Sequence, residues 1–358
     1  MDKIIRVAIA GYGRSGCNIH GNYLATDPRF KVIAVADNLP DRRKEAADKF
    51  NCQTYESFEE MIEKGGFDLL INATPSPFHV ACSKMGLEHG FNVIGEKPSA
   101  PTVAEFDMLV ATADKHKCLF MPYQNSRFYP FFAKMREVIA SGVLGKIVCI
   151  RSNWSGFGRR WDWQTRQENI AGNLFNTGPH PVDQAIVLFG EGMPKVFCRM
   201  DSVQHGLGGD ADNFCTVSLY GEGHPLIEIQ ISSLQAYPQG EMYNIQAEFG
   251  GLTGGPNGLK WKYFDPAKAP KQEFWKPWSK DRQYCSEKLE WIEKEWTFDN
   301  NESNASGFKG LSAAIYDNYY NVMVNNAPRV ITLDQVRRQV YVMEEAHRQN
   351  PLPKTPRP

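Results

Sequence analysis

A glycine-rich segment near the N-terminus constrains the fold more than any other part of the chain. Gly11-Tyr12-Gly13-Arg14-Ser15-Gly16 comes directly after a short apolar run, Arg6–Ala10, and opens a helical pattern over Ser15–Ala25. Glycines at these positions permit a tight turn, close approach of the backbone to a pyrophosphate, and close packing of the helix on the strand. The segment therefore predicts a strand–loop–helix unit that binds the phosphates of a dinucleotide at the helix N-terminus.

Strand and helix patterns alternate through the first third of the chain. Short apolar runs separated by amphipathic segments indicate a parallel sheet covered by helices on both faces. We therefore expect a doubly wound α/β domain over residues 1–124. Its expected strands are Arg6–Ala10, Lys31–Ala36, Phe67–Ala73, Phe91–Gly95 and Cys118–Pro122, and its expected helices are Ser15–Ala25, Asp41–Lys49, Phe78–His89 and Thr102–His116.

After about residue 124 the pattern changes, and strand-like runs follow one another with few helices between them. Grouped strands predict a mainly antiparallel sheet in a second α/β domain over residues 125–358. Residues 254–301 are rich in Gly, Pro, Lys and Trp and predict no definite element, and the tail 351–358 is expected to be loose. The expected strands are Lys146–Trp154, Pro194–Ser202, Asn213–Tyr220, Pro225–Ser233 and Tyr243–Phe249, and the expected helices are Pro130–Ser141, Pro181–Phe189, Ser306–Val324 and Leu333–Arg348.

An acidic residue stands where a dinucleotide site needs one. Asp37 ends the second predicted strand, 21 residues after Gly16. A carboxylate there can accept hydrogen bonds from both ribose hydroxyls of NAD and would repel the 2′-phosphate of NADP; the alternative is an ordinary turn aspartate. Two further strand ends, Ala73-Thr74-Pro75 and Gly95-Glu96-Lys97-Pro98, belong to the same carboxyl edge of the sheet, where ligands bind in such folds.

These motifs, with one more from the second domain, resemble those of a known family. The glycine loop, the turn Ala73-Thr74-Pro75 with His79, the motif Glu96-Lys97-Pro98, and the segment Asn176-Thr177-Gly178-Pro179-His180-Pro181-Val182-Asp183 resemble, in order and spacing, those of the Gfo/Idh/MocA oxidoreductases (glucose–fructose oxidoreductase, inositol dehydrogenase and a rhizopine-catabolism protein). The resemblance implies an N-terminal Rossmann domain and a C-terminal α/β domain with an open, mostly antiparallel sheet. It also implies a cis peptide bond before Pro98.

The resemblance further implies an activity and a cofactor. Members of this family bind NAD or NADP and oxidise or reduce a secondary hydroxyl of a sugar, an inositol or a related ring. With Asp37 in place, we expect NAD. The expected cofactor-binding residues are Gly11, Tyr12, Gly13, Arg14, Ser15, Gly16, Asp37, Arg42, Thr74, Pro75, His79, Glu96, Lys97 and Asn125.

Catalytic roles follow from the chemistry of alcohol oxidation. The hydroxyl proton needs an acceptor, and neutral histidine suits that task near pH 7, so His180 is the expected base. The Lys97 ammonium can stabilise negative charge that develops on the same oxygen. Asn176 stands where the family usually has aspartate, and it can orient a hydroxyl but cannot accept a proton. Asp183 lies one helical turn after His180 and is expected either to orient His180 or to cap the helix.

Tryptophan is confined to the second domain, since all eight tryptophans lie between Trp154 and Trp296. Aromatic faces stack on the C–H faces of pyranose rings, and arginines hydrogen-bond hydroxyls. The densest cluster, residues 159–163, lies near the substrate by resemblance, as do the residues after the last strand of the first domain (Gln124, Asn125, Arg127). The expected substrate-binding residues are Lys97, Arg127, Arg160, Trp161, Trp163, Asn176 and His180.

The expected function is an NAD-dependent dehydrogenase of a sugar, glycoside or inositol, with C3 of a pyranose as the expected position. Two alternatives stay open. Some relatives oxidise C3 transiently, eliminate the aglycone and then reduce, which makes them NAD-dependent glycosidases. A regulator that senses NAD and a sugar without turnover shares the same fold.

Bulk composition excludes several other classes of protein. The 40 basic and 41 acidic residues argue against a nucleic-acid or membrane-surface partner. No apolar run approaches the roughly 20 residues that span a bilayer, and no secretory signal is evident, so a cytoplasmic protein is expected. The eight cysteines are scattered without a C-x-x-C pair, which favours isolated buried thiols over disulfides or zinc. We expect no metal, a small carbohydrate substrate, and a homo-oligomer.

Overall fold

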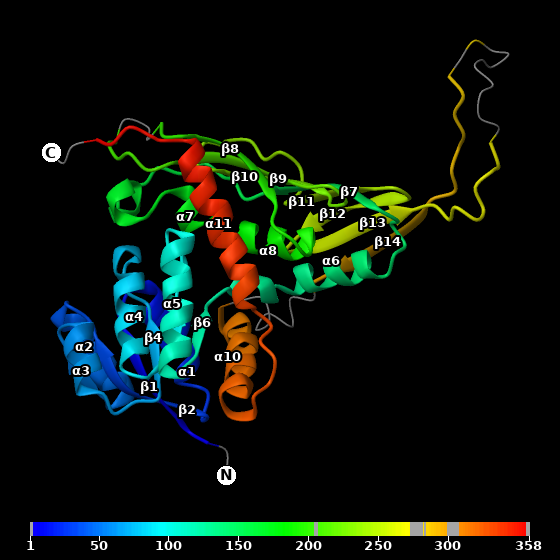
Figure 1. Cartoon of the computed structure of the whole chain (residues 1–358). Coiled ribbons are helices and arrows are strands. Elements are labelled where there is room, and N and C mark those ends of the chain that lie inside the picture. The colour runs from blue at the N-terminus through cyan, green and yellow to red at the C-terminus, as the bar shows by residue number, and fades with distance from the viewer. Residues whose placement is uncertain (1–2, 204–206, 273–281, 283, 299–307, 356–358) are drawn as a thin grey trace.

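Two β-sheets divide the molecule in the computed structural model, which describes residues 3–203, 207–272, 282, 284–298 and 308–355. The first sheet lies in the N-terminal half, and the second lies beyond it at the far end of the molecule (Figure 1). The helices and strands expected within both halves are present, most of them with bounds that differ by one or two residues. The α/β class and the two-part organisation are therefore confirmed.

The first sheet has six parallel strands in the order β3-β2-β1-β4-β5-β6. The strand order reverses between β1 and β4, which is where ligands bind in doubly wound sheets. The short edge strand β3, which the sequence pattern did not reveal, precedes a further unexpected helix, α3 (Phe58–Lys64). The strands are β1 (Ile5–Ala10), β2 (Phe30–Ala36), β3 (Gln53–Tyr55), β4 (Leu69–Asn72), β5 (Asn92–Gly95) and β6 (Phe120–Pro122).

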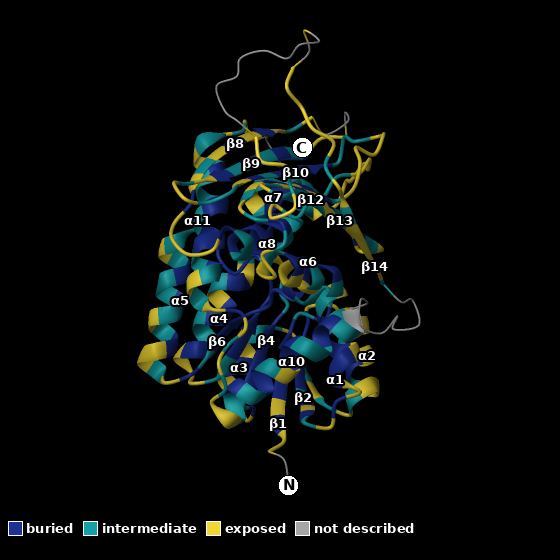
Figure 2. Cartoon of the chain, turned by 90° about the vertical axis from the view of Figure 1, so that its right-hand side faces the viewer, coloured by how far each residue is buried: buried dark blue, intermediate teal, exposed yellow. Residues whose placement is uncertain are grey.

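Helices cover both faces of this sheet. Helices α3, α4 (His79–Glu88) and α5 (Val103–His116) pack side by side, while α1 (Asn22–Leu24) packs against the C-terminal helix α10 (Phe308–Asn325). Figure 2 shows the strands of this sheet as a buried layer between more exposed helices. The expected helix after the glycine loop is instead a π-helix, η1 (Arg14–Gly21), followed by α1. The remaining helix, α2 (Pro40–Phe50), follows β2.

The second sheet has eight strands in the order β14-β13-β12-β11-β7-β10-β9-β8. Only the β10–β7 pair is parallel, so the prediction of a mainly antiparallel sheet is confirmed. Helices α6 (Pro130–Ala140), α8 (Pro179–Phe189) and α11 (Leu333–Gln349) pack on it. The strands are β7 (Ile147–Asn153), β8 (Lys195–Asp201), β9 (Phe214–Tyr220), β10 (Leu226–Ser232), β11 (Tyr243–Ala247), β12 (Gly250–Gly255), β13 (Gly258–Tyr263) and β14 (Ile292–Thr297).

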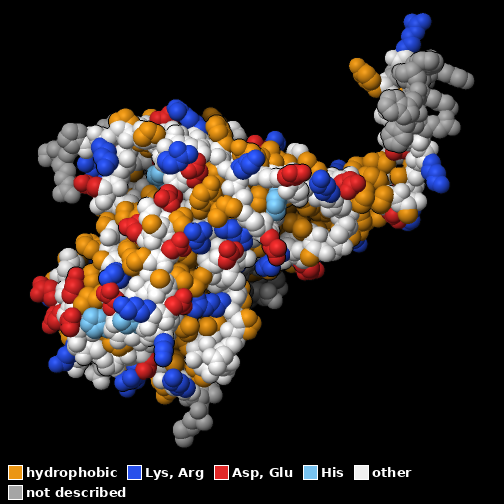
Figure 3. Space-filling model, in the orientation of Figure 1, with side chains coloured by type: hydrophobic (Ala, Val, Ile, Leu, Met, Phe, Trp, Pro, Cys, Tyr) orange, Lys and Arg blue, Asp and Glu red, His pale blue; other side chains and the backbone are white. Residues whose placement is uncertain are grey.

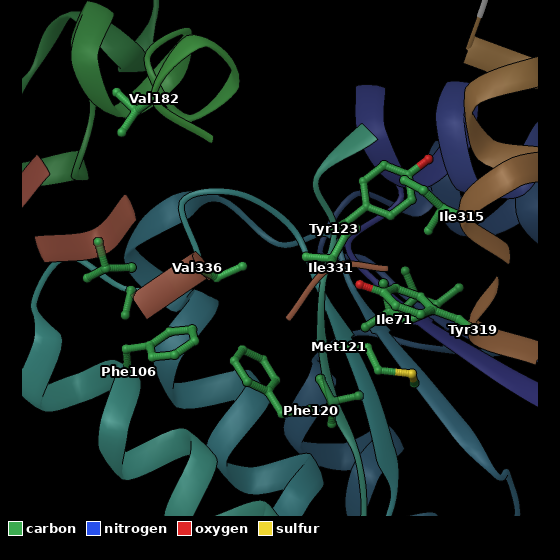
Figure 4. Close-up of a cluster of buried hydrophobic side chains, with 14 of the residues drawn as sticks. Ile71, Phe106, Phe120, Met121, Tyr123, Val182, Ile315, Tyr319, Ile331 and Val336 are labelled. Carbon is green, nitrogen blue, oxygen red and sulfur yellow. The ribbon is translucent and has the colours of Figure 1, made fainter. Parts of the chain in front are cut away.

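Residues from both ends of the chain share one hydrophobic core around β6. In Figure 4, Met121 lies near Tyr319 of α10 and Tyr123 lies near Ile315 of the same helix, while Phe106 of α5 lies near Val336 of α11. The hydroxyl of Tyr319 also donates to the carbonyl oxygen of Pro122, 2.5 Å away. The C-terminal helices are therefore part of the packing of the N-terminal sheet.

The tail is anchored, contrary to expectation. The Thr355 N–H donates to Asp210, and the side chains of Arg166 and Gln167 donate to tail carbonyl oxygens. The prolines of the tail lack a backbone N–H but keep their carbonyl acceptors. The loop around Arg166 presents side-chain donors to these carbonyl oxygens. Pro356 to Pro358 lie outside the described residues.

The charge distribution on the surface agrees with the balanced composition. Figure 3 shows basic and acidic side chains interspersed over the visible face.

All eight cysteines are free thiols; five are buried, but Cys17 and Cys52 are half-buried and Cys285 is exposed, so the expectation of burial is wrong for these three. Within the described residues, every helix is too short or too polar to cross a bilayer.

Candidate active site

A cavity of about 780 Å³ lies at the carboxyl edge of the first sheet and is lined by both halves of the chain. The first half supplies the glycine loop, the end of β2 and the turns after β4 and β5. The second half supplies the loop before α7 (Asn173–Asn176), the C-terminal end of α7, and the start of α8. The expected site residues that line it are Gly11, Gly13, Arg14, Ser15, Asp37, Arg42, Thr74, Pro75, Glu96, Lys97, Asn125, Arg160, Trp163, Asn176 and His180.

The glycine loop has the close backbone contacts that its sequence predicts. Gly11 has a φ of +84°, and a Cβ atom there would lie 2.5 Å from the carbonyl oxygen of Ala73. A Cβ on Gly16 would lie 1.9 Å from the carbonyl oxygen of Gly11. Neither position tolerates a side chain. Gly16 and Tyr12 support the loop and do not line the cavity, and their contact with a cofactor stays a prediction.

Asp37 holds the turn beside this loop and faces the cavity. Its carboxylate accepts the backbone N–H of Tyr12 at 2.8 Å and that of Leu39 at 3.0 Å. The Arg42 guanidinium lies 3.5 Å from the same carboxylate. Backbone N–H donors fix the orientation of the carboxylate and leave lone pairs free for ribose hydroxyls.

His79 joins two of the strand ends from behind the cavity. Its ring nitrogens lie 2.8 Å from the carbonyl oxygen of Pro98 and 2.8 Å from that of Thr74. Burial lowers the pKa of His79, and the hydrogen bond to Pro98, the Glu96 charge and the hydrogen bond to Thr74 oppose that shift. The Lys97-Pro98 peptide bond is cis, as expected. His79 is buried and does not line the cavity; its two contacts support the turns that form the cavity wall, and its role in cofactor binding stays a prediction.

Lys97 reaches from the first half of the chain to the second. Its ammonium donates to the backbone carbonyl oxygen of Asn176 at 2.8 Å, and the amide oxygen of Asn176 lies 3.4 Å away. Burial lowers the pKa of Lys97; the Glu96 carboxylate opposes this shift, and the cations Arg14 and Arg160 add to it. The ammonium is thus easier to deprotonate than an ordinary lysine.

His180 faces the same cavity and is neutral. Burial, and next the Lys97 charge, lower its pKa to about 3. Its Nδ1 atom is buried without a hydrogen-bond partner in the described part of the chain. The Trp154 ring lies parallel to it, with centroids 6.2 Å apart. Because orphaned buried N–H groups are rarer than orphaned acceptors, this environment favours the tautomer with the proton on Nε2.

Arg127 and Asp183 form a buried ion pair, which corrects two expectations. Both side chains are almost fully buried, with exposed fractions of 2% and 0%. The Arg127 guanidinium binds both oxygens of Asp183 and also the side chain of Gln335. Asp183 therefore neither orients His180 nor caps the helix, and Arg127 is outside the cavity lining. A sequence pattern cannot show this pairing, because the partners lie on separate elements.

The loop before α7 provides the remaining polar groups. Arg160 donates to Asp162 at 2.9 Å and to Gln164, and these residues line the cavity with Trp163. Trp161 is 79% exposed and does not line it, so its contact with a substrate stays a prediction. Asp162 and Gln164 were missed, although they flank a tryptophan that was singled out. Other lining residues missed from sequence are Ile19, Ala36, Asn38, Glu56, Ser57, Phe58, Glu59, Ala73, Phe78 and Thr177.

Fold and site together define a Rossmann-fold oxidoreductase with its cavity between two domains. Residues 5–124 match the model of the oxidoreductase family with an NAD-binding Rossmann fold, GFO_IDH_MocA. Residues 132–253 match the C-terminal domain model of the same family. The chain belongs to the Gfo/Idh/MocA family, as the motifs indicated, and NAD is the cofactor of the domain it carries.

Similar proteins include enzymes of several kinds. An NADP-dependent scyllo-inositol 2-dehydrogenase of Bacillus subtilis is 27% identical over 61% of this chain and 60% of its own length. A 2,7-anhydro-N-acetylneuraminate hydratase of Mediterraneibacter gnavus is 26% identical over 54% of this chain and 51% of its own. The aligned segments thus span only about half to 60% of these relatives.

Solved structures share the fold along the whole chain. The WlbA dehydrogenase of Bordetella pertussis, solved with NADH and UDP-GlcNAcA, has a TM-score of 0.78 at 20% identity and covers 100% of this chain and 99% of its own. GenD2 from gentamicin A biosynthesis, solved with NAD, has a TM-score of 0.73 at 19% identity and covers 100% of this chain and 98% of its own.

Proposed function

We propose that this protein is an NAD-dependent oxidoreductase that transfers a hydride between nicotinamide and a secondary hydroxyl of a sugar, glycoside or inositol. One observation carries the proposal: the Lys97 ammonium and the His180 imidazole, from separate halves of the chain, line the same cavity as the glycine loop and Asp37. A cavity that combines a dinucleotide-binding loop with two side chains able to accept or donate a proton suits alcohol oxidation.

The residues present fit NAD. Glycine at positions 11 and 16 lets the loop pack closely on the turn after β4 and on itself, so that the start of η1 lies at the cavity, where helix N-terminal N–H groups can stabilise phosphate charge. Asp37 offers a fixed carboxylate for ribose hydroxyls, and its negative charge disfavours the 2′-phosphate of NADP. Arg42 partly offsets that charge, so the expected preference for NAD over NADP is incomplete.

The bound nicotinamide supplies the hydride acceptor, and the protein must manage the hydroxyl proton. The expected base, His180, is neutral as required, but a pKa of about 3 makes it a weak proton acceptor. Lys97, whose pKa is lowered from that of an ordinary lysine, is the stronger candidate for accepting the proton. His180 then donates from Nε2 to the same substrate oxygen, and Asn176 orients a neighbouring hydroxyl.

The substrate class is supported by what surrounds these groups. Arg160, Asp162 and Gln164 form a hydrogen-bonded set on the cavity wall, and Trp163 provides an aromatic surface beside them. Such a mixture of charged, amide and aromatic side chains suits a polyhydroxylated ring. The oxidised position, with C3 of a pyranose as our choice, rests on the family's range of substrates.

A second candidate is an NAD-dependent glycosidase that oxidises C3, eliminates the aglycone and reduces the product. Two observations favour the glycosidase. The site has Asn176 in place of the aspartate usual in the family, and one relative is named a hydratase. A non-catalytic sensor is the third candidate, and the cavity-facing Lys97 and His180 count against it.

The test is to incubate the purified protein with NAD and a panel of inositols, hexoses and glycosides while recording absorbance at 340 nm and mass spectra. A dehydrogenase produces NADH and an oxidised ring. A glycosidase releases the aglycone without net NADH and introduces solvent deuterium at C2. Lys97→Ala and His180→Ala should each bind NAD and lose turnover; activity at the wild-type rate in either would reject the assigned roles.

We also propose that the outer face of the second sheet joins copies of this chain. A second cavity of about 1100 Å³ lies over β11 to β14, bordered by Trp261 and Trp291. Its lining also holds oppositely charged side chains, Lys262 and Glu293 among them, which a two-fold contact between copies would bring together. Light scattering after size exclusion would show a monomer if the proposal is wrong.

A further inference from the structure

A buried line of polar contacts runs behind Lys97, on elements that the proposed chemistry does not use. His20 of η1 is fully buried. Its Nδ1 atom lies 2.8 Å from the Tyr316 hydroxyl, and its Nε2 atom lies 3.2 Å from a carboxylate oxygen of Glu96. The Tyr123 ring packs against the imidazole, with centroids 4.5 Å apart. The π-helical turn thus places His20 between α10 and the residue that precedes Lys97.

Glu96 connects this line to Lys97 in two ways. The second oxygen of its carboxylate accepts the backbone N–H of Lys97 at 3.1 Å. Burial by itself would raise the pKa of Glu96, but the hydrogen bond and charge of His20, followed by the charge of Lys97, lower it to about 2. Glu96 is therefore a buried carboxylate whose two oxygens contact His20 and the backbone N–H of Lys97.

We propose that His20, held by Tyr316, is a positioning residue for Lys97: it keeps Glu96 ionised and oriented, and Glu96 in turn sets the protonation of the lysine in the cavity. The inference deepens the proposed function, because it assumes that Lys97 handles the proton. An apolar residue at position 20 would leave a buried carboxylate without its hydrogen-bond donor, and that carboxylate would then take up a proton.

The charges that face Lys97 give the direction of the effect. Glu96 is a neighbouring anion, whereas Arg14 of η1 and Arg160 of the loop before α7 are cations, and His180 is neutral. Loss of the Glu96 charge leaves the cations unopposed. The pKa of Lys97 should then fall by about one unit or more, as expected when an opposite charge within a few ångströms is lost.

The test measures the titration of Lys97 without any substrate. Competitive acetylation with acetic anhydride across pH 6 to 11, read by mass spectrometry, reports the pKa of Lys97, and the exposed Lys115 in the same sample is the internal standard. His20→Leu should shift the Lys97 titration to lower pH. His20→Gln retains an N–H donor for Glu96 and should keep most of the wild-type titration. Tyr316→Phe removes only a hydroxyl and should shift it less, in the same direction.

A double-mutant cycle separates this role from a structural one. Glu96→Gln should cause the same shift as His20→Leu, and the double variant should shift no further, because both act through one charge. Additive shifts in the double variant would overturn the proposal, and so would an unchanged Lys97 titration in both His20→Leu and Tyr316→Phe. If His20→Leu does not fold, Tyr316→Phe and His20→Gln decide the question. Because no substrate enters, the outcome is independent of whether the proposed dehydrogenase activity is found.

Discussion

The ammonium of Lys97 donates a hydrogen bond to the backbone carbonyl oxygen of Asn176, 2.8 Å away on the other half of the chain. Both residues line the cavity with His180. A side chain from one domain is thus held by the main chain of the other, so the two halves must be correctly docked before the site exists. The predictions below follow from this arrangement.

Replacing Lys97 by methionine keeps much of its volume and removes its charge. We expect kcat to fall by about 10²-fold or more, the usual effect of losing a group that handles a proton or stabilises an oxyanion. NAD affinity, measured by fluorescence titration, should stay within about threefold of wild type. Lys115→Met, on the exposed surface of α5, is the matched control. A kcat loss in the control, or none in Lys97→Met, would contradict the role.

The pH dependence of alcohol oxidation should report Lys97. The reactive form is the neutral amine, so kcat/KM should rise as pH rises through the pKa of Lys97, which lies below the usual lysine value. His180, with a pKa of about 3, should contribute no step between pH 5 and 8. A step near pH 6.5 that disappears in His180→Asn would instead make His180 the base.

Asn176→Asp restores the carboxylate usual in the family and tests the charge balance of the site. The amide oxygen lies 3.4 Å from the Lys97 ammonium, so a carboxylate there favours the charged lysine. The pKa values of Lys97 and His180 should both rise, and the ascending limb of the oxidation profile should move to higher pH. Asn176→Ser, which adds no charge, is the control. A limb that stays in place would show that this position does not influence Lys97.

Asp37→Asn tests cofactor preference by removing the negative charge; its one amide oxygen can accept the N–H of either Tyr12 or Leu39, which bond to different oxygens of the carboxylate. Removing the charge beside Arg42 should strengthen NADP binding by about tenfold or more, or roughly 1.4 kcal/mol, and weaken NAD binding several-fold. Asp41→Asn, on the exposed side of α2, is the control. Calorimetric titration with both cofactors measures the ratio, and an unchanged ratio would exclude Asp37 as the determinant.

Arg127→Met should destabilise the protein without acting on substrate. It leaves Asp183 buried without its partner, which costs about 3–5 kcal/mol of unfolding free energy. Urea denaturation should show this loss, and the double variant Arg127→Met/Asp183→Leu should recover part of it. Any remaining activity should have a wild-type KM, whereas Arg160→Met should raise KM. A stable Arg127→Met with a raised KM would restore the substrate role that the sequence suggested.

Regular patterns in the sequence were sufficient for most of the fold. Strands such as β1 and β4 are continuous apolar runs, and helices such as α5 have a clear apolar face, so their positions could be predicted to within one or two residues. The short edge strand β3 has too few residues to show a pattern. Strand β13 alternates lysine with aromatic residues, and β14 has three consecutive charged residues, so neither shows the apolar–polar alternation typical of a strand.

The site was predictable where a motif fixes the backbone and not where contacts cross between elements. The glycine loop, Asp37 and Lys97 lie at strand ends, and topology alone brings them to one edge of the sheet. Arg127 follows a strand end as well, yet its guanidinium turns to Asp183, which lies 56 positions later in the sequence. His20 gave no signal, because nothing in a helical segment reveals a partner such as Tyr316.

Helix α10 supplies Tyr316 to His20 and Tyr319 to the end of β6, although it follows the entire second sheet in sequence. The cofactor-binding unit is therefore discontinuous along the gene. An exchange of this unit with that of a relative, whether by recombination or by design, would need to transfer two distant coding segments at once. A graft that ends near residue 124 would place foreign loops against a helix shaped for other neighbours.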